Sequence, residues 1–376
     1  MEKIQMVDLK NQYLKIKPEI DKAIFEVIDS TAFVKGNKVK EFEKEFASYM
    51  GVKHVIACAN GTDALQLALM ALDLKPGDEV ITSDFTFIAT VEVIALLGLT
   101  PVLVDIDYEN FNMIPELVKK AITSKTKAII PVHLFGQCAP MEEIMEIAKE
   151  YKLYVIEDSA QASGASYKFQ NETTQKAGTI GDVGCTSFFP SKNLGCFGDG
   201  GALMTNNDAL AEKISIIANH GMKVRYYHDM IGINSRLDTI QAAVLCCKLK
   251  YLDQFNKHRR EAADYYDSKL SGLPNLITPY RVNYSDHIFH QYTLKLKNID
   301  RDKFIKYMND KGIPAMIYYP VPLHSQKAYK DSRYNENDFQ VSNQLSNCVL
   351  SLPMHSELDK EQLEYITSSV IEFVLA

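Results

Sequence analysis

The segment HVIACANGTDALQLALMALDL, residues 54–74, combines two patterns that together indicate a fold class. It begins with a short apolar run, turns at Asn60 and Gly61, and continues with apolar residues at helical spacing. The strand run is continuously apolar rather than alternating, which indicates a strand covered on both faces of its sheet. A buried strand that leads directly into a helix is the repeating unit of α/β folds.

The same unit recurs along the first two thirds of the chain. Further strand runs are DEVITS, TPVLVDID, KAIIPVH, LYVIED, CTSFF and GALMTN. We therefore predict a large α/β domain over residues 1–249, with an N-terminal helix and a mostly parallel, mixed sheet flanked by helices. Residues 236–270 have the pattern of one long helix, and residues 250–376 are expected to form a smaller α+β domain.

Composition excludes several classes of function. The chain has 376 residues, of which 46% are hydrophobic and 24% charged, and its formal net charge is −7 with no block of like charge. This balance argues against a nucleic-acid partner. Its longest apolar runs, such as VEVIALLGL, are too short to span a bilayer, and its first residues contain no apolar signal core, so we expect a cytoplasmic protein without a membrane partner. Seven cysteines without a C-x-x-C pair and nine scattered histidines predict that no metal is bound.

Polar residues gather where the predicted strands end, which is where open α/β sheets bind ligands. Gly61, Thr62 and Asp63 open a helix, whose free N–H groups and positive dipole end suit a phosphate. A cap made by Asn60 or Thr62 explains the same residues. Asp158 ends the strand LYVIED, and a carboxylate there needs a cation or several donors unless it caps a loop.

One lysine lies in an unusual setting, the segment TSFFPSKNLGCFGDGG at residues 186–201. Desolvation among Phe188, Phe189 and small residues would lower the pKa of Lys192, and a neutral amine is the form that attacks a carbonyl. Lys192 is therefore a Schiff-base candidate, although a surface lysine on a glycine-rich loop would fit the pattern too. A phosphate seat, a strand-end acid and such a lysine are together what pyridoxal phosphate requires.

Several specific motifs occur in one order along the chain: NGTDAL, PGDEVI, VDID, LFGQ, VIEDSAQ, TSFFPSK, GDGGA and NSRLDTIQAA. With this set the chain resembles the DegT/StrS nucleotide-sugar aminotransferases, a family of fold type I pyridoxal 5'-phosphate enzymes. The resemblance implies an aspartate aminotransferase-like fold, L-glutamate as amino donor, a nucleotide-linked keto-sugar as acceptor, and a homodimer with shared active sites. Strings such as CANGTDALQ and GASYK are similar to those of enzymes that aminate UDP-2-acetamido-2-deoxy-3-oxo-D-glucuronate for O-antigen and other surface polysaccharides.

The resemblance also implies roles for residues around the cofactor. Lys192 would bind the aldehyde as a Schiff base and later move the proton, and Asp158 would keep the pyridine nitrogen protonated. Gln161 would lie near the 3-hydroxyl or merely bond the backbone. Phe87 would stack on the ring, although in its apolar run it also fits a core position.

The remaining implied roles concern the phosphate and the substrate. Gly61, Thr62, Asp63 and Ser187 would hold the phosphate, together with Asn234 reaching in from a second subunit. Arg236, Tyr319 and His324 would contact the sugar. Arg236 also fits an interface salt bridge, and His133 either bonds at its strand end or lies behind the cofactor.

Three alternatives follow from the same residues. The chain has Tyr318-Tyr319 where relatives specific for the uronate tend to carry His-Tyr, and Phe87 where they carry Tyr, so a dTDP-linked 3-keto- or 4-keto-6-deoxyhexose stays open as the acceptor. Family members that dehydrate sugars have histidine at the lysine position, and Lys192 argues against that reaction. A non-catalytic regulatory or DNA-binding role conflicts with the acidic balance and with the complete set of Lys192, Asp158 and Gln161.

Overall fold

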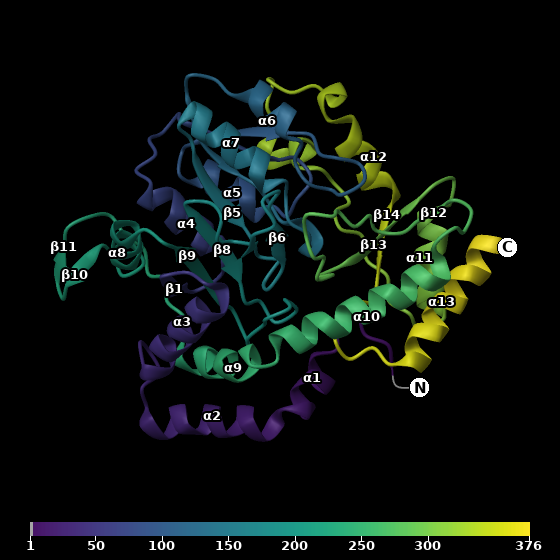
Figure 1. The fold of residues 1–376 in the computed structure, drawn as a ribbon, viewed down its shortest axis with the longest axis horizontal. Helices are drawn as coiled ribbons and strands as arrows, with labels where there is room; N and C mark the ends of the chain where they lie inside the picture. Colours follow the sequence, from purple (N-terminus) through teal and green to yellow (C-terminus); the bar gives the residue numbers. More distant parts are fainter. Residues whose placement is uncertain (1–2) are drawn as a thin grey trace.

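A seven-stranded sheet forms the centre of the computed structural model, which describes residues 3–376 (Figure 1). Its strand order is β1-β9-β8-β5-β4-β2-β3. The strands are β1 (His54–Cys58), β2 (Glu79–Ser83), β3 (Thr100–Val104), β4 (Thr126–Ile130), β5 (Tyr154–Asp158), β8 (Val183–Ser187) and β9 (Gly201–Thr205). β9 runs antiparallel to both of its neighbours, while the other pairs are parallel. The predicted mostly parallel, mixed sheet is confirmed.

Helices cover both faces of this sheet, which explains why its strands are continuously apolar. The helices that follow its strands are α4 (Gly61–Ala71), α5 (Ala89–Leu96), α6 (Pro115–Ala121), α7 (Met141–Tyr151) and α8 (Asp208–Ile217). One core contains α4, α5 and α8 with Val80, Ile130 and Ile156. The opposite core contains α6 and α7 with the neighbouring strand residues Ile81, Ile129 and Val155. Adjacent strand residues thus alternate between two apolar layers.

The N-terminal helices pack against the middle of the chain rather than on the sheet alone. They are α1 (Leu9–Lys15), α2 (Lys17–Ser30) and α3 (Asn37–Met50), and α2 and α3 both contact α9 (Thr239–Leu249). α9 is followed by α10 (Leu252–Leu270), a long helix that runs from the large sheet to the C-terminal part (Figure 1).

The single helix predicted for residues 236–270 is wrong, because α9 and α10 are separate. The Tyr251 N–H bonds to the Lys248 carbonyl at 3.0 Å, an i to i−3 bond that interrupts the α-helical ladder. The two helices also bury different surfaces. α9 is buried on almost every side, whereas the buried residues of α10 form one stripe.

A smaller α+β unit follows, as predicted. Its antiparallel sheet has the order β12-β13-β14, and its core draws on residues 262–370 together with Ile4. The elements are β12 (Leu276–Ile277), β13 (Tyr292–Leu296), α11 (Arg301–Asp310), α12 (Gln340–Cys348), β14 (Val349–Leu352) and α13 (Lys360–Leu375). The dividing line between residues 1–249 and 250–376 stays a prediction.

Within the described residues 3–376, two hairpins and four short 3₁₀ turns complete the structure. They are β6 (Ser166–Lys168) with β7 (Thr174–Lys176), β10 (Met222–Val224) with β11 (Tyr227–His228), η1 (Leu134–Gly136), η2 (Leu323–Ser325), η3 (Lys327–Tyr329) and η4 (Glu336–Phe339). The β10–β11 hairpin extends away from the body of the molecule, at the end opposite the C-terminus (Figure 1).

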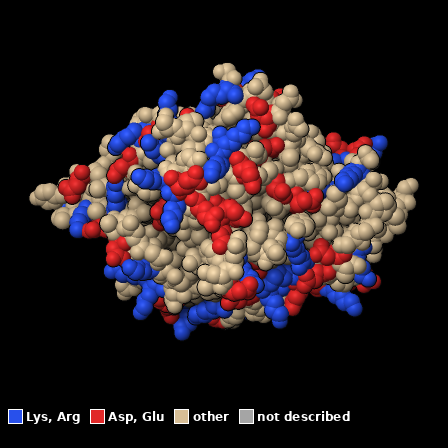
Figure 2. Space-filling view, turned by 45° about the horizontal axis from the view of Figure 1, so that its top comes forward, with Lys and Arg blue, Asp and Glu red and all other residues tan. Residues whose placement is uncertain are grey.

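Charged side chains of both signs are interspersed on the face drawn in Figure 2, which has no broad basic area. Within residues 3–376, no helix combines the length and the apolar character needed to cross a membrane.

Candidate active site

The predicted site residues of the large sheet lie at the carboxyl ends of its strands. β1 ends before Gly61, β5 ends at Asp158 and β8 ends at Ser187, and these strands lie close together in the sheet. The sheet therefore brings residues from distant parts of the sequence to one edge, where open α/β sheets bind ligands.

The first turn of α4 lies against Ser187. Asn60 caps the helix, because its Oδ1 accepts the Asp63 N–H at 2.8 Å. The N–H groups of Gly61 and Thr62 precede the helical ladder and have no acceptor within it. A Cβ on Gly61 would lie only 2.7 Å from the Cβ of Ser187. The cap and the anion site suggested by the sequence are compatible, because Asn60 accepts the Asp63 N–H and leaves the N–H groups of Gly61 and Thr62 free. Only glycine at position 61 allows Ser187 to lie so close.

Two adjacent carboxylates at the end of β5 have different surroundings. Glu157 is fully buried and accepts the N–H groups of Gly178, Ile180 and Gly181 at 2.6–2.8 Å as well as Nε2 of His133 at 2.8 Å. These donors saturate its two oxygens, so Glu157 is a structural residue that fixes the loop before β8.

The carboxylate of Asp158, in contrast, can accept further hydrogen bonds. It is 6% exposed and accepts the Thr90 hydroxyl at 2.8 Å and the Ala160 N–H at 3.2 Å. Among residues 3–376, no cationic side chain forms an ion pair with it. A buried carboxylate without an ion-pair partner can still accept a hydrogen bond from a charged donor, and a protonated ring nitrogen would supply one.

Lys192 lies in a loop whose backbone is tied down on both sides. The Lys192 N–H bonds to the Phe189 carbonyl at 2.8 Å, and the buried Lys248 of α9 donates to the Gly195 carbonyl at 2.6 Å. Phe188 is buried and its ring packs against Phe42 and Phe46, whereas Phe189 is half-exposed. Burial lowers the pKa of Lys192 to about 8, while the negative charge of Asp158 acts in the opposite direction. The lowered pKa increases the share of Lys192 that is a neutral amine, as the sequence suggested.

Gln161 connects the sheet edge to the C-terminal part of the chain. Its Oε1 accepts the Phe135 N–H at 2.8 Å, and its Nε2 donates to the hydroxyl of Tyr319 at 2.9 Å. The Tyr319 ring lies 6.3 Å from that of Phe87, whose side chain is 55% exposed. Phe87 is thus not a core residue. The structure brings Gln161, Tyr319 and Phe87 to one place, and their roles toward a ligand stay predictions.

His324 lies close by but is held by protein groups. Its N–H and Nδ1 each lie 2.8 Å from an oxygen of the buried Asp84, and its Nε2 lies 3.2 Å from Glu336. Burial lowers the pKa of His324, but the bonds to Asp84 and Glu336 outweigh burial and raise it. The imidazole therefore pins residues 323–325 to the end of β2, and its contact with a sugar stays a prediction.

Among residues 3–376, no hydrogen bond or ion pair joins the side chain of Asn234 or Arg236 to Lys192, so their roles in the site stay predictions. Asn234 is exposed and pairs with Asn219, while Arg236 lines a hollow of about 190 Å³ with Lys35. Burial lowers the pKa of Lys35, and the charge of Arg236 lowers it further. Two cations held together in this way suit an anion supplied by another molecule.

The sequence analysis missed Thr90, Asn193 and His290. Thr90 is a fully buried hydroxyl between the apolar residues Ala89 and Val91 in the first turn of α5, a signal that could have been noticed. Asn193 and His290 contact each other over 97 residues of sequence, and nothing local indicates their pairing.

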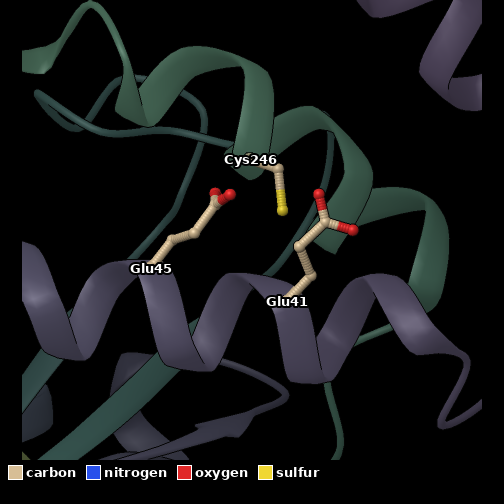
Figure 3. A group of neighbouring side chains, drawn as sticks. All are labelled: Glu41, Glu45 and Cys246. Carbon is tan, nitrogen blue, oxygen red and sulfur yellow. The ribbon is translucent and has the colours of Figure 1, made fainter.

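A separate group of potential ligands lies between α3 and α9. Glu41, Glu45 and Cys246 point toward one another, with ligand atoms within 4.8 Å (Figure 3). Burial raises the pKa of the Cys246 thiol to about 12, and the nearby carboxylates raise it too, so the sulfur keeps its proton at neutral pH. A protonated thiol is a poor metal ligand, and the predicted absence of a bound metal stays a prediction.

Comparison with known proteins identifies the family. The model of the DegT/DnrJ/EryC1/StrS aminotransferase family matches residues 14–371. The chain belongs to this family. The DegT/StrS resemblance and the aminotransferase class expected from the sequence are thereby confirmed.

Three relatives of this aminotransferase cover nearly its whole length. The "pleiotropic regulatory protein" of Geobacillus stearothermophilus is 45% identical, with 98% of each chain covered. The UDP-2-acetamido-2-deoxy-3-oxo-D-glucuronate aminotransferase of Pseudomonas aeruginosa is 44% identical, covering 98% of this chain and 99% of the relative. The dTDP-3-amino-3,4,6-trideoxy-alpha-D-glucose transaminase of Streptomyces venezuelae is 38% identical, covering 99% and 96%.

Solved structures agree with the family and the fold. DesV of S. venezuelae, in complex with a ketimine intermediate, has a TM-score of 0.95 at 38% identity and is covered completely, as is this chain. NtdA of Bacillus subtilis, with bound cofactor PMP, has a TM-score of 0.88 at 31% identity, covering 96% of this chain and 82% of that one. The predicted fold type I architecture is confirmed.

Proposed function

We propose that this aminotransferase uses pyridoxal 5'-phosphate to move an amino group from L-glutamate to UDP-2-acetamido-2-deoxy-3-oxo-D-glucuronate, for the sugars of an O-antigen or another surface polysaccharide. The observation that carries the proposal is the pairing of Asp158, a buried carboxylate with acceptor capacity left over, with Lys192, an amine of lowered pKa, at one edge of the sheet. The Pseudomonas relative bears the name of this reaction and is 44% identical.

The residues at this edge fit the cofactor in three places. The free N–H groups at the start of α4, together with Ser187, suit a phosphate, and the absence of a side chain at Gly61 lets Ser187 lie close to them. Asp158 suits a protonated pyridine nitrogen, because that cation would complete its hydrogen bonding. Lys192 suits the aldehyde. Bound pyridoxal phosphate supplies a carbonyl carbon for amine exchange and a ring that holds the electron pair released when a proton leaves the substrate.

Each side chain then has a defined task. With a pKa of about 8, a sizeable share of Lys192 is neutral at mildly basic pH, so it can bond to a carbonyl carbon and, once displaced, carry a proton to or from the substrate. Asp158 is oriented by the Thr90 hydroxyl and the Ala160 N–H, and its carboxylate would accept a hydrogen bond from a protonated ring nitrogen. Phe87, exposed beside Tyr319, offers a flat apolar surface for the ring.

The proposal includes a homodimer whose active sites are shared. Supporting observations are the exposed apolar side chains of the projecting β10–β11 region, where Tyr226 is 76% and Ile231 is 87% exposed. Apolar surface of this kind marks interaction sites in folded proteins. Arg236 and Lys35 lie at a neighbouring surface and would offer their paired positive charge to an anionic substrate in the partner's site.

A cytoplasmic location is also part of the proposal. All seven cysteines lie among the described residues and are free thiols, most of them buried, which fits a reducing compartment.

A dTDP-linked keto-6-deoxyhexose is the second candidate acceptor. It is supported by the Streptomyces relative, whose name describes a dTDP-amino-sugar product, and by Tyr318-Tyr319 in place of the His-Tyr pair. A purely regulatory role, suggested by the name of the Geobacillus relative, is not favoured, because the chain retains Lys192 and Asp158 in a setting that suits catalysis.

The test is a half-reaction. The enzyme is converted to its amine-carrying form with glutamate, freed of donor, and given one keto-sugar at a time while the absorbance of the lysine-bound cofactor is followed. Return of this absorbance with the 3-oxo-glucuronate supports the proposal. Return only with a dTDP-keto-deoxyhexose would transfer it to the second candidate, and no return with either, in an enzyme that accepts glutamate, would refute both.

A further inference from the structure

A buried hydrogen-bond network starts at Asn193, the residue next to Lys192. Asn193 is 3% exposed, and its amide nitrogen donates to Oδ1 of Asn256 at 2.7 Å and to the Ile288 carbonyl at 3.2 Å. The amide nitrogen of Asn256 donates in turn to the Ser163 carbonyl at 3.1 Å. Because backbone carbonyls only accept hydrogen bonds, each amide has a single consistent orientation, and the network has a fixed direction.

This direction determines the tautomer of His290. Nδ1 of His290 lies 3.2 Å from Oδ1 of Asn193, an atom that can only accept. Nδ1 must therefore carry the hydrogen, which leaves Nε2 of the neutral ring with a free lone pair. The same ring is 5% exposed.

The electrostatic surroundings keep this ring uncharged. Burial lowers the pKa of His290 well below its ordinary value, and the positive charges of Lys192 and Arg259 lower it further. Arg259 of α10 is itself buried and bound to the carbonyls of Phe289, His290 and Met354. The charged group that acts on Lys192 from β5 is Asp158. The charge of Asp158 thus acts on the Lys192 amine, and the charge of Lys192 acts in turn on the imidazole of His290.

The network also joins four separate segments of the chain. It connects the Lys192 loop, the segment after β5 that contains Ser163, the N-terminal part of α10 and the residues that precede β13. Asn193 cannot shift without leaving a buried donor or acceptor unpaired, which is costly. The backbone beside Lys192 is therefore held by groups from both parts of the molecule.

We propose that Asn193 and His290 are positioning residues for Lys192: they fix the backbone beside the lysine and keep an uncharged ring within electrostatic reach of its amine. This rests on the proposed function, in which Lys192 bonds to the cofactor. Neither residue is expected to touch the substrate. Their effect should therefore appear in the titration of Lys192 and in kcat, and not in the KM of either substrate.

Three replacements of His290 separate positioning from packing. His290→Asn places an amide nitrogen where Nδ1 was and can still donate to Asn193, whereas His290→Gln places its nitrogen near the former Nε2 position, and His290→Leu has no donor. His287→Leu is the matched control, since His287 is also buried and, among residues 3–376, its side chain accepts the Phe289 N–H and stacks on the Phe289 ring without bonding to Asn193.

The measurement is the pH titration of the cofactor absorbance in the full-length, pyridoxal-phosphate-loaded enzyme, together with kcat and KM. We expect His290→Leu and His290→Gln to move the titration midpoint by about half a unit or more and to lower kcat about tenfold, with both KM values within about twofold. His290→Asn should restore kcat to within about threefold of the parent, and the control should match the parent.

Parent-like titration and kcat in the Gln and Leu variants would overturn the proposal, as would an Asn variant no better than Gln. If His290→Leu does not fold, the comparison of His290→Asn with His290→Gln still tests the proposal. Failure of the proposed function is recognised separately, because the parent enzyme would then not take up pyridoxal phosphate at Lys192. In that case the pH dependence of acylation of the Lys192 amine in the cofactor-free protein reports the same shift.

Discussion

The neighbouring acids Glu157 and Asp158 should respond in opposite ways to the same change, replacement of the carboxylate by an amide. In Glu157→Gln, one oxygen that accepts two hydrogen bonds becomes an NH₂ group that can only donate. In Asp158→Asn, the new NH₂ group can donate to the Thr90 hydroxyl, because a hydroxyl both accepts and donates. The first variant should therefore lose stability, and the second should keep it.

The magnitudes follow from these contacts. Glu157→Gln leaves at least one buried donor unpaired, at a cost of about 3 kcal/mol, which lowers Tm by roughly 4 °C for a chain of this length. Asp158→Asn should change stability by less than about 1 kcal/mol. It removes the charge that would hold a protonated ring nitrogen, a charged hydrogen bond of about 2–3 kcal/mol, so kcat should fall about 30- to 160-fold.

The assay combines thermal unfolding with the rate of the glutamate half-reaction at saturating donor. The account predicts a destabilised Glu157→Gln enzyme that keeps most of its kcat at low temperature, and a stable Asp158→Asn enzyme that has lost most of it. An Asp158→Asn variant with parent-like kcat would refute the reasoning about the acceptor capacity of Asp158. A Glu157→Gln variant with unchanged Tm would refute the claim that buried donors occupy both oxygens of Glu157.

Three further predictions concern the lysine, the phosphate seat and the interface. Because the pKa of Lys192 is lowered to about 8, the rate of cofactor uptake should rise with pH through about 8 and then level off; a midpoint near the ordinary lysine value of 10.5 would contradict this. Gly61→Ala should weaken cofactor binding about tenfold in an equilibrium titration, since its Cβ would lie 2.7 Å from that of Ser187, whereas Gly198→Ala meets only the end of the flexible Gln241 side chain and should bind normally. Ile231→Asp should shift the protein toward monomers in sedimentation and lower its activity, while Leu375→Asp, an exposed apolar residue at the opposite end of the molecule, should do neither; equal sedimentation of both variants would contradict the proposed interface (Figure 1).

The sheet and its main site residues could be predicted from the sequence because their signals are local. Continuous apolar runs mark strands covered on both faces, and the strand-end rule then places Asp158, Gly61 and Ser187 at one edge without knowledge of any contact. Lys192 could be predicted because a lysine is unusual in a segment of small and aromatic residues.

The rest depends on contacts that no local pattern reports. Glu157 and Asp158 are adjacent carboxylates, and the sequence does not distinguish their roles. Only the fold shows that backbone N–H groups of residues 178–181 occupy the oxygens of Glu157. In the sequence, His324 is simply a polar residue in a loop. Only the structure shows that its two ring nitrogens lie beside Asp84 and Glu336. The break between α9 and α10 follows from the different surfaces that the two helices bury, which the shared helical periodicity conceals.

The most direct measurement is to load the protein with pyridoxal phosphate, reduce it with borohydride and map the labelled peptide by mass spectrometry. Lys248 is an internal competitor, since burial also lowers its pKa to about 8, but it is 2% exposed and its amine is bonded to the Gly195 carbonyl. We predict a single phosphopyridoxyl group on Lys192. A label on Lys248, or one spread over surface lysines, would contradict the assignment of Lys192 as the residue that bonds to the cofactor.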